Sequence, residues 1–239
     1  MLNFIGCGSA FNTALGNNGA FIKKDHVLFL IDCGSSTFAR LQKTNLLEGI
    51  EEICILLTHT HCDHIGSLGD LILYGYYSMN KLAEANVCVY APNDLNIKPL
   101  LRMMGVEEHT YKLIEFSELT EYQYADFHID FEPIKVPHVK ELKSYGYIIH
   151  YDNKTIYYSG DCNEIPANIL NRQNNGGFDL FYQDTCIAEY EGNVHLSLKK
   201  LDKLMDAKAR EKVYCMHLDN GFNEEDAKKL GFNVVAPII

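Results

Sequence analysis

Short apolar runs alternate with longer, more polar stretches along the whole chain. Ile53–Leu57 is a continuous apolar run, which is typical of a buried strand. The stretches Leu68–Leu82 and Asn93–Met104 predict helices, and the strand expected between them is Val87–Tyr90. The other expected strands are Leu2–Ile5, Ala20–Lys23, Val27–Asp32, Phe178–Gln183, Val213–Met216 and Val234–Val235, with a strand-rich stretch from Tyr111 to Ser159, and the other expected helices are Ser36–Lys43, Ile165–Arg172, Leu196–Ala209 and Glu224–Leu230.

No linker, low-complexity tract or clear repeat interrupts this alternation. The chain has 239 residues, of which 47% are hydrophobic and 22% are charged, so it can bury a substantial core. We therefore expect an α/β protein with one domain over residues 1–239, in which the sheets lie inside and the helices outside.

The formal net charge of -11 restricts the partners that the surface can bind. Such a surface repels nucleic acid and anionic membranes unless positive charge is concentrated locally. The sequence has no run of about 18 apolar residues, which argues against a transmembrane helix. Its first residues, Met-Leu-Asn-Phe-Ile-Gly, lack the basic start and long apolar stretch of a secretory signal, so we expect a cytoplasmic protein with no membrane partner.

The eight cysteines are spread from Cys7 to Cys215 and never form a Cys-x-x-Cys pair. Cys54, Cys88 and Cys215 lie inside apolar, strand-like runs, where a free thiol packs as a small hydrophobic side chain. In a chain without a secretory signal, this pattern predicts reduced, structural cysteines.

Four potential metal ligands come directly after the predicted strand Ile53–Leu57. They are His59, His61, Asp63 and His64, in a loop at the carboxyl end of a strand, where α/β proteins tend to place their sites. His59 and His61 point the same way in an extended loop, whereas Asp63 and His64 require a change of backbone direction. One metal ion cannot easily bind all four, but two neighbouring ions can. The alternative, a capped loop with incidental histidines, requires four ligands at this spacing by accident.

Three more candidate ligands follow predicted strands further along the chain. His138 comes after the apolar stretch Phe131–Val136. Asp161 ends Ile-Tyr-Tyr-Ser-Gly-Asp, in which Gly160 permits a sharp turn, and His217 ends Val-Tyr-Cys-Met-His. Singly, each has an ordinary alternative as an exposed loop histidine, a helix-capping aspartate or a strand-end histidine. As a set at strand ends, they are expected to complete a site for a pair of metal ions.

The order of these residues resembles a known signature. His-x-His-x-Asp-His at His59–His64, followed by His138, Asp161 and His217, resembles the five-part signature of the metallo-β-lactamase fold. The match covers nearly the whole chain.

Four further segments resemble one branch of that fold, the phosphodiesterases that include ribonuclease Z, the tRNA 3′-end processing nuclease. Phe4–Phe11 reads Phe-Ile-Gly-Cys-Gly-Ser-Ala-Phe, and Leu30–Gly34 reads Leu-Ile-Asp-Cys-Gly. Gln183–Thr185 is similar to that branch's acidic segment, and His195–Ser197 is similar to its His-Ser-Thr motif.

The resemblance implies a four-layer αββα sandwich with two divalent metal ions at one edge of the sheets. Carried over by motif, His59, His61 and His138 hold the first ion, Asp63, His64 and His217 hold the second, and Asp161 bridges both. Imidazole with carboxylate favours zinc, and manganese or iron stay open. Cys62 and Cys162 adjoin ligands, and we expect them to pack away from the metals.

The resemblance also implies hydrolysis by a metal-bridging hydroxide, because two cations lower the pKa of the parent water. The leaving oxygen then needs a proton, and His195, at the start of a predicted helix, is the best candidate general acid. Asp184 is expected to orient His195 or a metal-bound histidine. Asp63 and His195 are the expected catalytic residues. A phosphate clamp and an ordinary surface histidine are the alternatives for His195.

The chain departs from ribonuclease Z in a feature that concerns the substrate. The usual bacterial enzyme carries a long Gly/Pro-rich basic arm that grips the tRNA elbow. Here the stretch from Lys81 to Tyr145 contains a single glycine, Gly105, and the whole chain is acidic. This argues against tRNA and favours a smaller phosphodiester, such as a cyclic nucleotide, a short oligonucleotide or a phospholipid-like diester. Whether the protein forms a homodimer stays open.

Two other functions remain as alternatives to a phosphodiesterase. A carbon-ester hydrolase, such as a lactonase or thioesterase, could use the same metal pair without His195. Its apolar pocket could be lined by Tyr74, Tyr76 and Tyr77. A non-enzymatic metal-binding or redox module would be expected to have replaced ligands or a fused flavin domain, and neither is visible. The sequence therefore favours a metal-dependent hydrolase of phosphodiesters.

Overall fold

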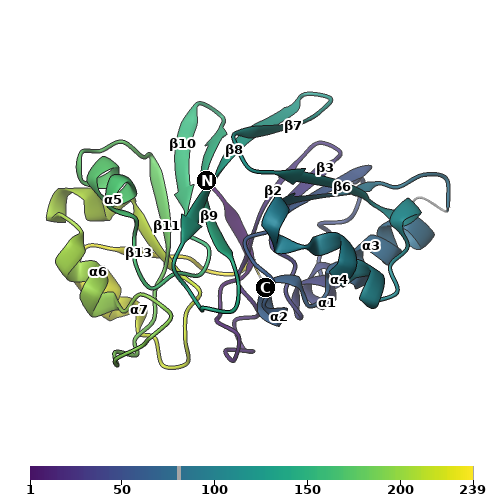
Figure 1. Cartoon of the computed structure of the whole chain (residues 1–239). Helices are drawn as coiled ribbons and strands as arrows, with labels where there is room; N and C mark the ends of the chain where they lie inside the picture. Colours follow the sequence, from purple (N-terminus) through teal and green to yellow (C-terminus); the bar gives the residue numbers. More distant parts are fainter. Residues whose placement is uncertain (80–81, 239) are drawn as a thin grey trace.

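The computed structural model describes residues 1–79 and 82–238. Within these residues, two β-sheets pack face to face and helices cover both outer faces (Figure 1). The expected order of layers, with helices outside and sheets inside, is confirmed.

The first sheet has the strand order β1-β2-β3-β4-β5-β6. Its strands are β1 (Asn3–Gly6), β2 (Gly19–Lys24), β3 (Val27–Ile31), β4 (Glu52–Leu56), β5 (Val87–Pro92) and β6 (Lys112–Phe116). The last four run parallel, so their carboxyl ends lie at the same edge. Every residue of β3 and β4 is buried, which explains why these segments read as continuous apolar runs.

The second sheet has the strand order β13-β12-β11-β10-β9-β8-β7. Its strands are β7 (Thr120–Tyr124), β8 (Phe127–Val136), β9 (Ser144–Tyr151), β10 (Lys154–Tyr158), β11 (Leu180–Asp184), β12 (Val213–Met216) and β13 (Asn233–Val234). β10 to β13 run parallel. β8 and β10 both pair antiparallel with β9, so β8 points the same way as β10. The carboxyl ends of β8, β10, β11 and β12 therefore share one edge.

Aromatic side chains from both sheets meet between the layers. Phe131 of β8 contacts Phe29 of β3 and Tyr90 of β5, with ring centroids 6.3 and 5.3 Å apart. Phe29 and Phe131 are fully buried, and they belong to one cluster of buried side chains that includes residues of both sheets. This apolar contact fixes the two sheets relative to each other, and with them the edge where the strand ends meet.

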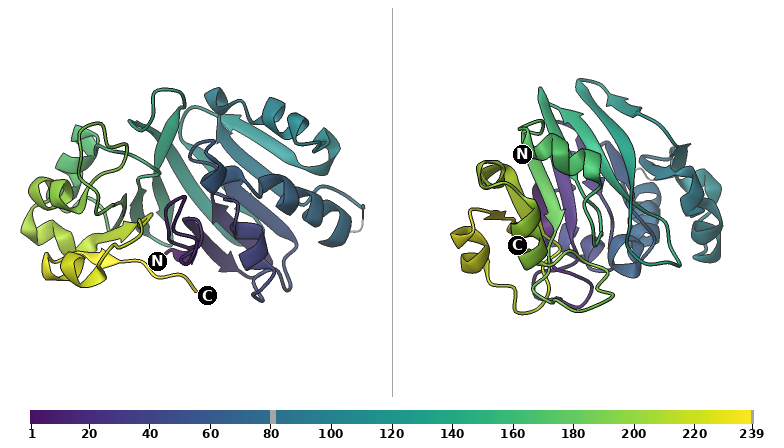
Figure 2. Two further views of the ribbon diagram at one scale, coloured as in Figure 1. Left: turned by 90° about the horizontal axis from the view of Figure 1, so that it is seen from below. Right: turned by 60° about the vertical axis from the view of Figure 1, so that its left-hand side comes forward.

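Short helices cover the outer faces (Figure 2). The helices beside the first sheet are α1 (Thr37–Leu41), α2 (Cys62–Ile65), α3 (Leu68–Tyr74) and α4 (Ile97–Met103), and those beside the second are α5 (Ala167–Asn174), α6 (Leu198–Leu204) and α7 (Glu224–Lys229). The short π- and 3₁₀-helical segments are η1 (Gly75–Met79), η2 (Asn93–Leu95), η3 (Glu108–Thr110) and η4 (Ala207–Lys212). Each helix within the described residues is too short or too polar to cross a bilayer.

The predicted helices were too long in three places. Leu68–Leu82 ends as an α-helix at Tyr74 and continues as the π-helical turn η1, while residues 80–81 of the prediction lie outside the described residues. Asn93–Met104 is interrupted at Asn96, whose φ of 55° is left-handed. Leu196–Ala209 is divided into α6 and η4, because Met205 leaves the helical conformation. Within the strand-rich stretch, the chain turns at Asp152–Asn153, where both residues have a left-handed φ.

Candidate metal centre

The carboxyl ends of strands from both sheets meet at one edge of the sandwich. His59 follows β4, His138 follows β8, Asp161 follows β10 and His217 follows β12. Asp184 is the last residue of β11. Because these strand ends share one edge, residues far apart in the sequence converge there. The structure brings all seven predicted metal ligands into this one site.

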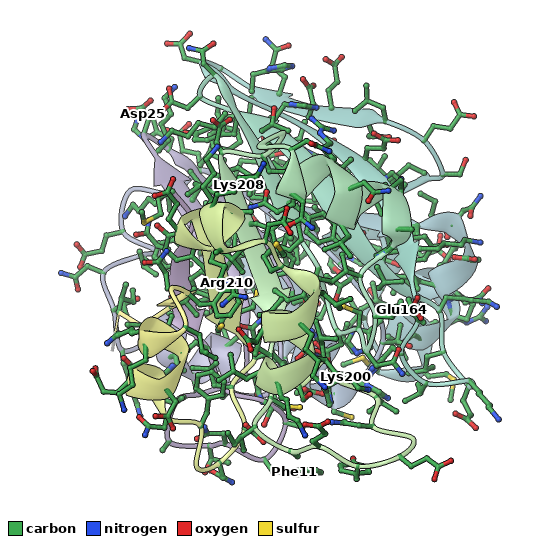
Figure 3. The ribbon with its side chains drawn as sticks, turned by 90° about the vertical axis from the view of Figure 1, so that its left-hand side faces the viewer. Phe11, Asp25, Glu164, Lys200, Lys208 and Arg210 are labelled. Carbon is green, nitrogen blue, oxygen red and sulfur yellow. The ribbon has the colours of Figure 1, made fainter. Side chains whose placement is uncertain are left out.

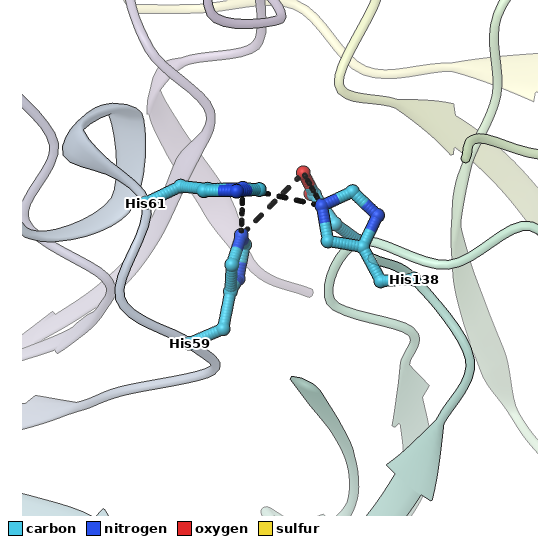
Figure 4. Close-up of side chains that lie close together, drawn as sticks. His59, His61 and His138 are labelled. Atoms are coloured by element: carbon cyan, nitrogen blue, oxygen red, sulfur yellow. Dashed lines mark hydrogen bonds and ion pairs between the residues drawn. The ribbon is translucent and has the colours of Figure 1, made fainter. Parts of the chain in front are cut away.

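The first cluster consists of His59, His61, His138 and Asp161, with one ligand atom of each lying within 4.8 Å of the others. Nε2 of His59 and Nε2 of His138 lie 3.0 and 3.2 Å from Nδ1 of His61. Oδ2 of Asp161 lies 3.8 Å from each of those two Nε2 atoms. Figure 4 shows the three imidazoles pointing toward one another. In a tetrahedral zinc site with bonds of about 2.1 Å, ligand nitrogens lie about 3.4 Å apart, so this spacing suits an ion.

The second cluster consists of Asp63, His64 and His217 and shares Asp161 with the first. Nε2 of His64 lies 3.3 Å from Oδ2 of both Asp63 and Asp161. Nε2 of His217 lies 3.2 Å from Oδ2 of Asp63 and 3.3 Å from Oδ2 of Asp161. One carboxylate oxygen of Asp161 therefore faces imidazole nitrogens of both clusters.

Buried polar atoms that lack a hydrogen-bond partner indicate whether this set of side chains fits metal ions. Among the described residues, Nε2 of His64 and Oδ1 of Asp161 are buried and accept or donate no hydrogen bond. Leaving a buried polar group unpaired costs about 1–3 kcal/mol, so native sites usually satisfy such atoms. Imidazole and carboxylate ligands suit zinc, and a cation at the second cluster would satisfy Nε2 of His64, which faces Oδ2 of both Asp63 and Asp161. The residues fit a pair of divalent ions.

The electrostatics of the site favour cations. Burial lowers the pKa of His217, but the carboxylates of Asp161, Asp184 and Asp63 outweigh burial and raise it to about 10. Burial likewise opposes the charged form of Asp161, yet His217 and His64 hold the pKa of Asp161 well below its ordinary value. The carboxylate therefore stays charged in the interior and attracts positive charge. Metal binding would displace the protons that the imidazoles otherwise hold.

Asp32, which was not among the predicted site residues, orients a predicted ligand. Its Oδ2 lies 2.8 Å from Nδ1 of His64. The backbone N–H and the hydroxyl of Thr58 each donate a hydrogen bond of 2.8 Å to the same carboxylate. These contacts direct Nε2 of His64 toward the second cluster. The signal for Asp32 was its position: it follows β3, the parallel neighbour of β4.

The backbone conformations of Gly160 and His217 position two of the predicted ligands, Asp161 and His217, in the site. Gly160 has a φ of 57°, and a Cβ there would collide with the carbonyl oxygen of Tyr145, so the predicted turn before Asp161 requires glycine. His217 has a left-handed φ of 58°, and its N–H donates to Oδ1 of the buried Asn18 at 3.2 Å. Such a conformation is uncommon outside glycine and is held here by its surroundings.

Asp184 connects His195 to the second ligand cluster through His217. Oδ2 of Asp184 lies 2.7 Å from Nδ1 of His195, and Oδ1 lies 3.4 Å from Nδ1 of His217. Burial lowers the pKa of His195, but the charge and hydrogen bond of Asp184 outweigh burial and raise the pKa above its ordinary value. The His195 side chain is 25% exposed, so the imidazole reaches both the carboxylate and the solvent side. The expected partnership with Asp184 is present in the geometry.

The sequence predicts His195 at the start of a helix, but in the structure the helix begins after it. Ser197 is the N-cap of α6, and its hydroxyl oxygen accepts a hydrogen bond from the N–H of Lys200. His195 lies in the loop before this cap, where its ring stacks on that of His217 with centroids 4.9 Å apart. The helix therefore begins after His195, and the ring of His195 packs against a predicted ligand.

A cavity of about 620 Å³ opens over the two clusters. It is lined by Ala10, Phe11, Thr13, Asn17, Ser35, Ser36, His61, Cys62, Asp63, His138, Asp161, Val194, His195 and His217. These lining residues, all in the described part of the chain, include no lysine or arginine. The volume is typical of sites for small-molecule ligands.

Two predictions about neighbouring side chains were wrong. Cys62 is exposed and lines the cavity instead of packing away from it, whereas Cys162 is buried as expected. Tyr74, Tyr76 and Tyr77 are absent from the cavity lining. Tyr74, the last residue of α3, packs on Phe38 of α1 with ring centroids 5.3 Å apart, and Tyr76 and Tyr77 belong to η1. The apolar pocket that a carbon-ester hydrolase would need does not form from these tyrosines.

The predicted packing of Cys54, Cys88 and Cys215 is confirmed, since all three are buried. All eight lie in the described part of the chain and are free, and seven of them are buried. Burial raises the pKa of Cys33 and Cys7 to about 12, which makes these thiols unreactive.

Comparison with known families identifies relatives along nearly the whole chain. Residues 1–236 match the family model described as Anti-Pycsar protein Apyc1. The anti-Pycsar protein Apyc1 of Paenibacillus harenae is 27% identical over 248 residues, covering 99% of this chain and 97% of the relative. The Apyc1 protein of Saccharibacillus brassicae is 29% identical and covers 84% and 82%. That of Bacillus phage vB_BsuM-Goe3 is 27% identical and covers 93% and 90%.

Solved structures share the fold. YhfI of Bacillus subtilis, a metallo-β-lactamase fold protein, superposes with a TM-score of 0.76 at 19% identity, covering 99% of this chain and 96% of that one. A diphosphatase of the PhnP family gives 0.75 at 19% identity, covering 98% and 94%. The short form of human tRNase Z gives 0.68 at 16% identity, covering 98% and 95%. The metallo-β-lactamase fold and the resemblance to the ribonuclease Z-like branch are confirmed.

Proposed function

The chain belongs to the Anti-Pycsar protein Apyc1 family, and on that basis we propose that it is a metal-dependent phosphodiesterase whose substrate is a cyclic nucleotide. The observation that carries the proposal is the position of Asp161. Its Oδ2 faces both ligand clusters, and the Asp184–His195 pair lies directly beside them. His195, which we take as the candidate proton donor, lies 2.7 Å from Asp184 and beside the site that we propose for two cations.

We propose that the seven ligands divide between two zinc ions as the sequence motif implies. His59, His61 and His138 would hold one ion, Asp63, His64 and His217 would hold the other, and Asp161, which belongs to both groups of side chains, would serve both. When bound, two such ions supply a nucleophilic water at neutral pH and neutralise charge on the phosphoryl oxygens. The chain contributes rigid placement, since the ligands come from the ends of buried strands of both sheets.

His195 is the residue that moves a proton. Its Nδ1 donates to Asp184, which leaves Nε2 to hold a proton at the cavity side. Against the opposing effect of burial, the charge and hydrogen bond of Asp184 raise the pKa of His195, which favours the protonated imidazole. A ribose oxygen leaving from phosphorus needs such a proton, because an alkoxide is a poor leaving group. Asp184 holds the imidazole in the orientation that makes the transfer possible.

The cavity supports a small substrate with a single negative charge. The cavity lining carries no lysine or arginine, so bound metal ions would have to balance the negative charge of the phosphate. A cyclic phosphodiester carries one such charge and is of the size that a cavity of about 620 Å³ accepts. A nucleic acid needs cations spread along its backbone, whereas this chain has a net charge of -11. A cyclic nucleotide therefore suits the site better than tRNA.

The shared core of the two sheets supports a single domain over residues 1–239. Free thiols throughout the chain suit the reducing cytoplasm, which is where we propose that the protein acts.

A panel of substrates tests the proposal. Zinc- or manganese-loaded protein is assayed with a 3′,5′-cyclic nucleotide, a precursor tRNA, a thioester and a lactone between 50 and 200 mM salt. We expect hydrolysis of the cyclic nucleotide with weak salt dependence. An enzyme that makes 6–10 phosphate contacts would lose about 10³–10⁵-fold in affinity over that range. Efficient trimming of tRNA with that steep loss, or turnover of only the thioester or lactone, would contradict the proposal.

A further inference from the structure

Phe11 is the most exposed large apolar side chain beside the metal centre. It is 86% exposed, yet it lines the cavity that contains the predicted ligands. It belongs to the loop between β1 and β2 and lies at the lower edge of the molecule in Figure 3. Two other exposed apolar side chains, Ile187 at 46% and Tyr190 at 60%, lie in the loop after β11. An aromatic ring left in water beside a ligand site commonly marks a binding surface.

A second cavity adjoins the first at Phe11. It has a volume of about 300 Å³, and Phe11, Val194, His195 and His217 line both cavities. Tyr190 lines only the second. Phe11 therefore lies where the first cavity, over the two ligand clusters, meets the second cavity. A substrate with its phosphate at the clusters can extend its remaining part past His195 toward this ring.

The backbone that carries Phe11 is held firmly, although the ring is exposed. The carbonyl oxygen of Phe11 accepts a hydrogen bond from Nδ2 of Asn220 at 3.2 Å. The adjoining Asn12 donates through Nδ2 to the carbonyl oxygen of Leu218 at 3.0 Å, one residue after His217. The Phe11 loop is thus fixed to the strand end that carries a ligand, so its position relative to the clusters is preorganised.

The loop opposite Phe11 is fixed to the same strand end. Oδ1 and Oδ2 of Asp219 accept hydrogen bonds of 2.9 and 3.3 Å from the N–H groups of Ile187 and Ala188. Nδ2 of Asn193 donates to the carbonyl oxygen of Ala188 at 2.8 Å. The segment that bears Tyr190 and the loop that bears Phe11 therefore share one support, on either side of the second cavity.

We propose that Phe11, with Tyr190 facing the same cavity, forms an aromatic subsite that stacks on the base of the nucleotide substrate and thereby selects nucleotides over other small phosphodiesters. The inference rests on the proposed function. A flat, uncharged heterocycle suits the second cavity, whose lining in the described chain includes no lysine or arginine. Because every base has a π-face, stacking of this kind recognises a base with little preference for its identity.

Two substrates separate the contribution of the base from the chemistry at phosphorus. One is a 3′,5′-cyclic nucleotide, and the other is 1-deoxyribose 3′,5′-cyclic phosphate, which has the same ring and phosphate but no base. Phe11→Ala should raise KM for the nucleotide about 5–20-fold with little change in kcat, since stacking contributes to binding and not to the transition state alone. It should leave KM for the base-free substrate unchanged. Phe11→Trp should restore the KM for the nucleotide.

Tyr77→Ala is the matched control, because Tyr77 is 53% exposed but lines neither cavity. It should change no kinetic constant. Equal KM values of wild type and Phe11→Ala for the nucleotide, or an equal rise in KM for both substrates, would overturn the inference. If the wild type turns over neither substrate, the proposed function fails. Calorimetric binding of the two compounds to zinc-loaded protein then decides the inference. Weaker binding of only the nucleotide by Phe11→Ala supports the inference, and unchanged binding overturns it.

Discussion

Oδ2 of Asp32 lies 2.8 Å from Nδ1 of His64, and both side chains are almost completely buried. Asp32 follows β3 and His64 belongs to α2, so the contact joins the end of a strand to the helix that carries two predicted ligands. It fixes which nitrogen of His64 faces the second cluster. An outer carboxylate of this kind orients the imidazole and raises its basicity as a ligand.

Asp32→Ala should therefore weaken both the fold and the second metal site. Removing one partner of a buried pair costs about 3–5 kcal/mol of the free energy of unfolding, because the other polar group is left unpaired. Zinc affinity should fall about 10–100-fold. Urea unfolding and competition with a chromophoric chelator measure the two effects. Asp126→Ala, at an exposed position in the turn between β7 and β8, is the control. Wild-type zinc affinity in Asp32→Ala would show that the contact does not orient His64.

Metal content tests the shared position of Asp161. Wild-type protein should bind close to two zinc ions per chain, because one set of ligands lies on each side of Oδ2 of Asp161. Asp161→Ala should lower occupancy of both sites, whereas Asp63→Ala should lower mainly the second. Cys62→Ala should keep both ions, since the thiol belongs to neither ligand cluster. Elemental analysis of dialysed protein gives the answer: full occupancy in Asp161→Ala, or no metal in wild type refolded with zinc, is incompatible with the proposed ligand set.

The metal ligands could be predicted from sequence because they follow strands with unambiguous patterns. β4 and β10 end within one residue of the ends of their apolar runs, and His59 and Asp161 each lie three residues beyond the last residue of the strand. Parallel strands then place these residues at one edge without further information. Asp32 satisfies the same rule, but a single aspartate after a strand is common and has no metal-binding spacing. Its role depends on the contact with His64, which only the folded chain reveals.

Helix ends and side-chain exposure were harder to predict, because tertiary contacts decide them. The stretch Leu196–Ala209 has no proline or glycine to end a helix, yet Met205 adopts an extended conformation and its side chain is buried. Cys62 adjoins buried ligands, but as the first residue of α2 its side chain faces the cavity. The exposure of Phe11 likewise contradicts its apolar character. The last two departures lie at the site, where binding competes with packing.

Cys62 should be the one rapidly reactive thiol of the folded protein. All eight cysteines lie in the described residues, and Cys62 alone is exposed. Burial raises the pKa of Cys88 and Cys215 to about 12, which suppresses their thiolates. Ellman's reagent should therefore modify one thiol per native chain quickly, and all eight after unfolding. Cys62→Ser should abolish the fast reaction. A nucleotide product bound in the cavity should slow it in wild type, and several fast thiols in native protein would contradict the observed burial.

His195 gives the sharpest test of the proposed mechanism. It is absent from the two clusters assigned to the metal ions, so His195→Ala should keep both ions and the fold. If Nε2 protonates the leaving oxygen, the variant should lose about 10²–10⁴-fold in kcat on a cyclic nucleotide, whose ribose oxygen leaves poorly without a proton. The loss should be small on a 4-nitrophenyl diester, because nitrophenolate leaves unprotonated. A phosphate clamp would slow both substrates alike. His128→Ala, an exposed histidine on β8, is the control and should slow neither. Undiminished turnover of the cyclic nucleotide by His195→Ala would remove His195 from the reaction, despite its contact of 2.7 Å with Asp184.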